Sequence, residues 1–128
     1  MPLQGRMSSM GLTTNLFISH AETYHKNTQV VSINERSKKT RSTWGKVGKR
    51  SRHLASALKS LGVMEGDILG TISPNTINHL ELLYAISGCG AVAHTINPRL
   101  FPDEIVFIIN DAKDKILFVD TAYLPFLI

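Results

Sequence analysis

Few side chains in the sequence have the type and spacing that catalysis needs. Ser73 lacks the G-x-S-x-G context of a hydrolase nucleophile, and Cys89 has no second cysteine with which to hold zinc. The histidines show no metal-ligand spacing to Cys89 or to a carboxylate cluster: His20, His25, His53, His79 and His94. Glycine-rich phosphate loops of the G-x-x-x-x-G-K-[ST] and G-x-G-x-x-G types are also missing. The residues therefore predict no catalytic group and no metal site within the chain.

Positive charge is concentrated in one block between Arg36 and Lys59. This block holds nine of the fourteen Lys and Arg residues and no acid, in a chain of net charge +4. Such a block could bind nucleic acid, an acidic membrane or a polyphosphate ligand. A solvated helix face is the favoured interpretation, because Trp44 is the only aromatic residue among the basic ones and bases need stacking partners. We therefore expect no nucleic-acid partner.

Length and cysteine usage limit the class of protein. A chain of 128 residues with 43% hydrophobic residues is long enough to bury one core. A single cysteine is typical of a reducing compartment, so the expected location is the cytoplasm. No apolar run approaches the length of about 18 residues that spans a bilayer, so the sequence predicts no transmembrane segment.

The elements that must position these side chains alternate between strands and helices. Apolar periodicity and turn residues predict a helix at 16–24, a hairpin that starts with the strand 28–33, and helices after Thr43, around 75–88 and at 101–112. Core strands are expected at 68–73, 91–96 and 115–120. In the first long helix, the apolar stripe consists of Val47, Ser51, Leu54, Leu58 and Leu61. Gly62 is expected to end that helix in the left-handed conformation.

This order predicts the α/β class, with a mostly parallel sheet, flanking helices and a small amino-terminal hairpin. Ligands of such sheets bind beyond the carboxyl ends of the strands. The favoured places are therefore 73–75, 97–99 and 120–121. The sequence also stops soon after a strand, which predicts that a larger protein has been truncated.

An ordered series of segments resembles a known family. The segments are Thr43-Trp44, "LASALKSLGVMEGD", "NTINHLELLYAISGCGAV" and "HTINPRLFPDEIVFIINDA". Together they resemble the amino-terminal region of AMP-forming acyl-CoA synthetases, in the fatty and medium-chain acid–CoA ligase branch of the adenylate-forming superfamily. Lys46 stands where that family commonly has an acid. Residues 1–14 are rich in Ser, Thr, Gly and Met, which predicts a flexible lead-in, and the resemblance implies a truncated AMP-binding subdomain at 15–128.

The resemblance implies an ATP-dependent ligase that activates a carboxylic acid, such as a fatty acid, as an acyl-adenylate and transfers it to CoA. ATP, Mg²⁺ and CoA would serve the intact enzyme. The family's phosphate loop, nucleotide contacts, magnesium-binding acid and mobile-domain lysine all lie downstream of the matching segments. Because positioning and charge stabilisation would both be missing, we expect the 128 residues alone to be inactive.

One candidate binding site follows from the resemblance. In some family members, the turn that matches Asn97, Pro98 and Arg99 lies near the CoA nucleotide. Arg99 could then hold a phosphate through two parallel hydrogen bonds. The alternative is an ordinary Asn-Pro turn in which Arg99 only pairs with a neighbouring acid.

Two other functions stay open at this point. A non-catalytic interaction module, including a homodimer formed through this region, would bury the apolar end near Ile128. A basic nucleic-acid-binding module would use the block from Arg36 to Lys59, and its binding to DNA would weaken with salt.

Overall fold

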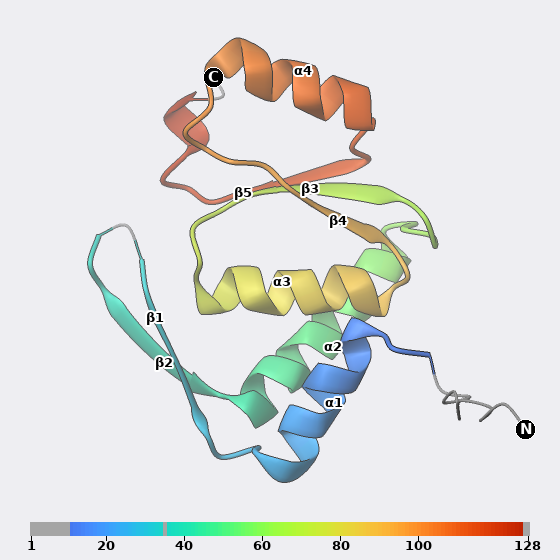
Figure 1. Ribbon diagram of the computed structural model, residues 1–128, viewed down its shortest axis with the longest axis vertical. Helices are drawn as coiled ribbons and strands as arrows, with labels where there is room; N and C mark the ends of the chain where they lie inside the picture. Colours follow the sequence, from blue (N-terminus) through green and yellow to red (C-terminus); the bar gives the residue numbers. More distant parts are fainter. Residues whose placement is uncertain (1–10, 35, 127–128) are drawn as a thin grey trace, which may run out of the picture.

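The structure is a computed structural model that describes residues 11–34 and 36–126 (Figure 1). In chain order, its elements are α1 (Thr14–Tyr24), β1 (Gln29–Ile33), β2 (Lys39–Thr43), α2 (Trp44–Ser60), β3 (Ile68–Ile72), α3 (Ile77–Gly88), β4 (Val92–Thr95), α4 (Pro102–Ala112), β5 (Ile116–Val119) and the short 3₁₀ helix η1 (Leu124–Phe126). The predicted boundary at residues 14 and 15 falls at the start of α1, and residues 1–10 of the expected lead-in lie outside the described residues.

The strands form two separate sheets. The core sheet has the order β4-β3-β5, and both pairings are parallel. Strands β1 and β2 pair antiparallel as a hairpin, in the register Val31 opposite Arg41. The predicted α/β class, parallel sheet and amino-terminal hairpin are therefore confirmed.

The core sheet lies between two helical layers (Figure 1). Helix α4 covers one face and α3 covers the other, while α1 and α2 pack against the far side of α3. Alternating residues of β3 serve the two faces. Leu69 contributes to the cluster on the α3 side, and Ile72 contributes to the cluster on the α4 side. Because the strands are parallel, their carboxyl ends meet at one edge of the sheet, on the left in Figure 1.

Helix α2 begins and ends with the local signals that the sequence predicts. The Thr43 side chain accepts a hydrogen bond from the Lys46 amide at 3.4 Å, and Gly62 follows the helix with a φ of 82°. Val47, Ser51 and Leu58 are buried as expected. Leu61, the last residue of the predicted stripe, is instead 70% exposed. That part of the prediction is wrong because the helix ends at Ser60, so Leu61 no longer follows the helical stripe.

Helix α3 is buried on two sides rather than along one stripe. Ile77, Leu82 and Ile86 are buried, as are the polar residues His79 and Glu81. Periodicity predicts one apolar face, whereas α3 packs against the sheet on one side and against α1 and α2 on the other. Its two buried polar side chains must therefore find partners within the fold.

Candidate functional site

A pocket of about 330 Å³ lies at the edge of the sheet where β3 and β5 end. Its polar lining consists of Ser73, Asn78, His79, Asp120 and Thr121. Two of the three places that the sequence favours, 73–75 and 120–121, therefore contribute residues to one pocket. The amides of these turns are tied to the sheet, because the Asp120 amide donates to the Ile72 carbonyl at 2.9 Å.

His79 projects from the first turns of α3 toward β3. Its Nε2 atom lies 3.0 Å from the Thr71 hydroxyl, and the residue is 7% exposed. Burial lowers the pKa of His79, and a contact with the Pro74 backbone opposes this shift. The imidazole is therefore neutral near pH 7, so it can orient a ligand by hydrogen bonding but brings no positive charge to the pocket.

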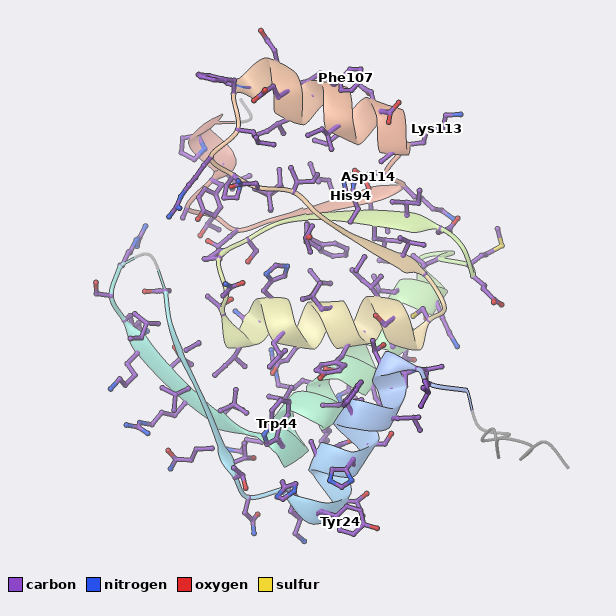
Figure 2. All side chains as sticks on the ribbon, in the orientation of Figure 1. Tyr24, Trp44, His94, Phe107, Lys113 and Asp114 are labelled. Atoms are coloured by element: carbon purple, nitrogen blue, oxygen red, sulfur yellow. The ribbon has the colours of Figure 1, made fainter. Side chains whose placement is uncertain are left out.

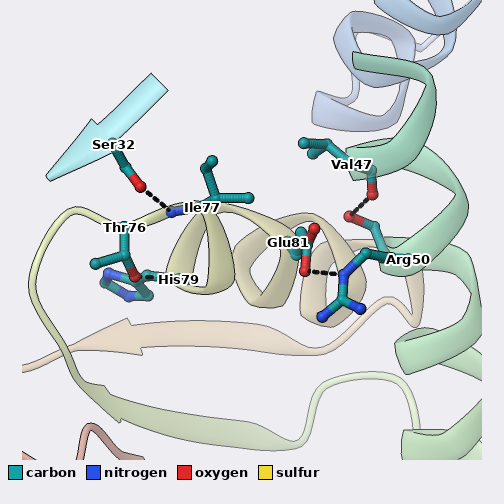
Figure 3. A network of polar contacts seen from close by, with 8 residues as sticks. Ser32, Val47, Arg50, Thr76, Ile77, His79 and Glu81 are labelled. Atoms are coloured by element: carbon teal, nitrogen blue, oxygen red, sulfur yellow. Dashed lines mark hydrogen bonds and ion pairs between the residues drawn. The ribbon is translucent and has the colours of Figure 1, made fainter. Parts of the chain in front are cut away.

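The start of α3 is fixed by side chains from outside the helix (Figure 3). The Thr76 hydroxyl accepts from the His79 amide at 3.3 Å, and the Ser32 hydroxyl accepts from the Ile77 amide at 3.3 Å. The second bond links the hairpin to α3. These caps set the position of His79 relative to the pocket.

The turn Asn97, Pro98 and Arg99 follows β4 at the same edge of the sheet. The Asn97 side chain accepts from the Arg99 amide at 3.0 Å, which is an Asx turn. Asn97 and Arg99 are exposed, and neither belongs to the lining of the pocket beside β3 and β5. Arg99 forms no ion pair with any carboxylate of residues 11–34 and 36–126. Its guanidinium group faces solvent, and its role in CoA contact stays a prediction.

A second buried polar pair lies between the sheet and α4 (Figure 2). His94 Nδ1 is 2.9 Å from Asp114 Oδ2, and the Asp114 side chain is 1% exposed. A carboxylate only accepts hydrogen bonds, so Nδ1 carries the proton that it shares with Asp114. A β-carbon on Gly70 would lie 2.9 Å from Asp114 Oδ2, so the glycine leaves room for this pair.

Sequence reasoning assigned no role to His79, Asp114 or Glu81. A signal existed for His79, because His79, Leu82 and Ile86 recur at i, i+3 and i+7 and so share one helix face. Asp114 stands in a polar turn, and its partner is 20 residues away in sequence. No local pattern distinguishes such a residue from a solvated one.

No group of three or more His, Cys, Asp or Glu side chains within the described residues could hold a metal ion. No helix in the described ranges is long and apolar enough to cross a membrane.

Comparisons with known proteins agree with this fold. Residues 17–126 match the family model described as AMP-binding enzyme. The chain is 45% identical to the 3-methylmercaptopropionyl-CoA ligase of Ruegeria lacuscaerulensis, over 94% of this chain and 22% of that protein. It is also 45% identical to the medium-chain-fatty-acid–CoA ligase of Ectopseudomonas oleovorans, again over 94% of this chain and 22% of that protein.

Among solved structures, an anthranilate CoA ligase in complex with anthranoyl-AMP superposes with a TM-score of 0.80. That match is 23% identical and covers 90% of this chain and 22% of the other, so it shows the shared fold. The chain spans about a fifth of the length of the curated relatives that it matches, at 22% for both. From the family model and the two relatives, the chain belongs to the AMP-binding enzyme family.

Proposed function

We propose that this chain is the amino-terminal part of an ATP-dependent, AMP-forming acid–CoA ligase. The observation that carries the proposal is 45% identity, over 94% of the chain, to two relatives that are both named as CoA ligases of carboxylic acids. The relative solved with anthranoyl-AMP supports an acyl-adenylate intermediate. The carboxylate attacks ATP and releases pyrophosphate, and the CoA thiol then displaces AMP from the acyl-adenylate. ATP, CoA, a carboxylic acid and Mg²⁺ are the reactants and metal of the whole enzyme.

The 128 residues contribute scaffold to this reaction rather than its reacting groups. They hold no glycine-rich phosphate loop, and the side chains of His79 and His94 are each bonded within the fold. We expect the purified chain to be inactive, because the phosphate loop and nucleotide contacts with which the family orients ATP and neutralises its phosphates lie downstream of the matching segments. The measurement is conversion of ATP to AMP with medium-chain acids. Acid-dependent AMP formation above the buffer rate would contradict the expectation.

Asn97, Pro98 and Arg99 are the proposed CoA-contacting residues. The solvent-facing guanidinium group of Arg99 and the carboxyl-end position of the turn support the proposal. In the whole enzyme, Arg99→Ala should raise the KM for CoA about tenfold through loss of a charge-assisted pair, while adenylate formation is unchanged. Arg36→Ala, an exposed arginine beside the hairpin turn, is the matched control. An unchanged KM for CoA in Arg99→Ala would reject the contact.

Homodimer formation and a cytoplasmic location remain parts of the proposal. Exposed apolar side chains on and beside α4, including Phe101, Val106 and Phe107, support a partner surface there. Ile128, which a partner would bury if the chain were an interaction module, lies outside the described residues. Light scattering of the purified chain tests for a dimer, and a monomeric mass would contradict the proposed homodimer.

A further inference from the structure

Each strand of the amino-terminal hairpin has an outer edge, the side that is turned away from its partner strand. The Asn34 amide donates to the Lys38 carbonyl at 3.1 Å, so these two residues are a bonded pair of the ladder. Bonded and non-bonded pairs alternate along antiparallel strands, so the N–H and C=O groups of Val31 and Ile33 point away from β2. Among the described residues, no backbone group outside the hairpin bonds to them.

The two outer edges of the hairpin differ in their side chains. Lys39 and Arg41 of β2 stand opposite Ile33 and Val31, and charged side chains protect an exposed strand from pairing with another. The strand β1 carries no charged residue, and Val31 and Ile33 are 46% and 58% exposed. β-branched side chains favour strand pairing. The outer edge of β1 is therefore apolar and unprotected, whereas that of β2 is protected by charge.

A pocket of about 280 Å³ lies between β1 and the amino-terminal half of α3. In Figure 1, β1 is the strand of the hairpin nearer to α3. Three consecutive residues of β1, 30–32, line the pocket. Successive side chains of a strand point to opposite faces, so a pocket lined by all three lies beside the edge of the strand. From α3, the lining includes Ile77, Leu80 and Leu83, so a segment placed along this edge would rest on apolar side chains.

The remainder of the enzyme is the occupant that best suits this edge. The chain spans 22% of each of two relatives named as CoA ligases, so a ligase of their length has most of its residues elsewhere. A hairpin of two strands is marginally stable by itself, and a third strand stabilises it. A segment of the same polypeptide also reaches the edge at a high effective concentration, an advantage that a second copy lacks.

We propose that, in the whole enzyme, an extended segment from beyond residue 128 pairs with the outer edge of β1 as a third strand of the hairpin sheet. Its backbone bonds to the outward N–H and C=O groups of Val31 and Ile33. Its alternate side chains are apolar and fill the pocket beside Leu80 and Leu83. The inference rests on the proposed function, because it takes the chain to be part of a longer ligase.

Hydrogen exchange of single amides tests the pairing in the 128-residue chain and in the whole enzyme, with mass spectrometry at residue resolution. In the chain alone, the amides of Val31 and Ile33 should exchange fast. In the whole enzyme they should exchange at least about a hundredfold more slowly, because a hydrogen-bonded amide exchanges only after local opening. The amides of Lys39 and Arg41, on the outer edge of β2, are the matched control and should stay fast in both proteins.

The Val31→Lys variant gives the outer edge of β1 the kind of side chain that protects β2. In the whole enzyme it should speed exchange at the Ile33 amide by at least about tenfold, because the added strand would have to cover a charge. Leu61→Lys makes the same replacement at an exposed leucine outside the hairpin and should leave that amide slow. If Val31→Lys prevents folding, exchange in the two unaltered proteins still decides the proposal.

Fast exchange at Val31 and Ile33 in the whole enzyme would overturn the proposal, and so would equal slowing at Lys39 and Arg41. Slow exchange in the chain alone, present only at high protein concentration, would assign the edge to a second copy instead. Acid-dependent conversion of ATP to AMP is measured on the same whole enzyme. Activity with fast exchange rejects the added strand but keeps the ligase, whereas slow exchange without activity rejects the ligase and keeps the strand.

Discussion

Helix α4 covers one face of the core sheet, and α3 covers the other together with residues of α2 such as Leu58, so α3 and α4 have different surroundings. Helix α3 is covered in turn by α1 and α2, whereas the outer side of α4 faces solvent (Figure 1). Val106 and Phe107 of α4 are 56% and 68% exposed, and Phe107 points away from the sheet in Figure 2. On α3, by contrast, even His79 and Glu81 are buried.

This difference shows how burial on two sides changes what a helix must contain. A polar side chain on the outer side of α4 can point into solvent, so it needs no hydrogen-bond partner within the fold. A polar side chain on either buried side of α3 must be bonded inside the fold, as His79 is to Thr71 and Glu81 is to Arg50. Within the part of the chain that the structure describes, Glu81 Oε1 is the one buried side-chain oxygen or nitrogen that has no hydrogen-bond partner.

The largest effect should come from opening a cavity on the α3 side. Leu69→Ala should lower the free energy of unfolding by about 2–5 kcal/mol, because Leu69 is fully buried beneath α3. Helix α3 is packed on both of its sides, so it cannot move to fill the cavity. Ile105→Ala is the matched change on the α4 side and should cost less, since α4 can shift outward. Urea unfolding measures both. A larger loss in Ile105→Ala would reverse the comparison.

Overpacking tests the α4 side directly. A β-carbon on Gly70 would lie 2.7 Å from Leu117 Cδ1. Gly70→Val should therefore lower the free energy of unfolding by about 1–3 kcal/mol. Gly88→Ala is the control, because its β-carbon would approach no atom closer than 3.7 Å and a helical alanine should stabilise the chain. An unchanged free energy of unfolding in Gly70→Val would mean that α4 can move away from the sheet more easily than its contacts indicate.

The protonation of His79 should make stability depend on pH. Its pKa in the folded chain is lowered by burial, so the unfolded chain binds the proton more tightly. Stability is complete above the ordinary histidine pKa of about 6.5 and falls as pH decreases from there toward the lowered value, by at most about 1.4 kcal/mol per pH unit. Thermal melts from pH 8 to pH 5 measure it. His79→Gln should flatten this part of the profile, whereas His53→Gln, at an exposed position, should not.

The smallest effect should come from the outer side of α4. Phe107→Ser should change the free energy of unfolding by no more than about 0.5 kcal/mol, because the ring is already largely in water. Urea unfolding at two protein concentrations checks this. A loss above 1 kcal/mol that grows with concentration would show that the ring is buried between copies of the chain.

Much of the fold could be predicted from local patterns. Thr43 and Gly62 mark the ends of α2 through capping and a left-handed turn, and the helix predicted at 101–112 is α4, which begins at Pro102. The carboxyl-end rule placed Ser73 and Asp120 at what proved to be one pocket. The same rule could not show that Asn97 and Arg99 lie outside the lining of this pocket. Whether a turn lines the pocket depends on the path of its backbone after the strand ends.

The sequence by itself therefore determined most of the elements and the mostly parallel character of the sheet, because caps, turns and periodicity are properties of neighbouring residues, and its ordered segments indicated the family. Only the tertiary structure decided which polar side chains are buried and with whom they bond. Three polar pairs each contain at least one buried side chain, and their partners are 8, 20 and 31 residues apart: His79 with Thr71, His94 with Asp114, and Glu81 with Arg50. Contacts at these separations arise from the packing of layers, and no local spacing encodes them.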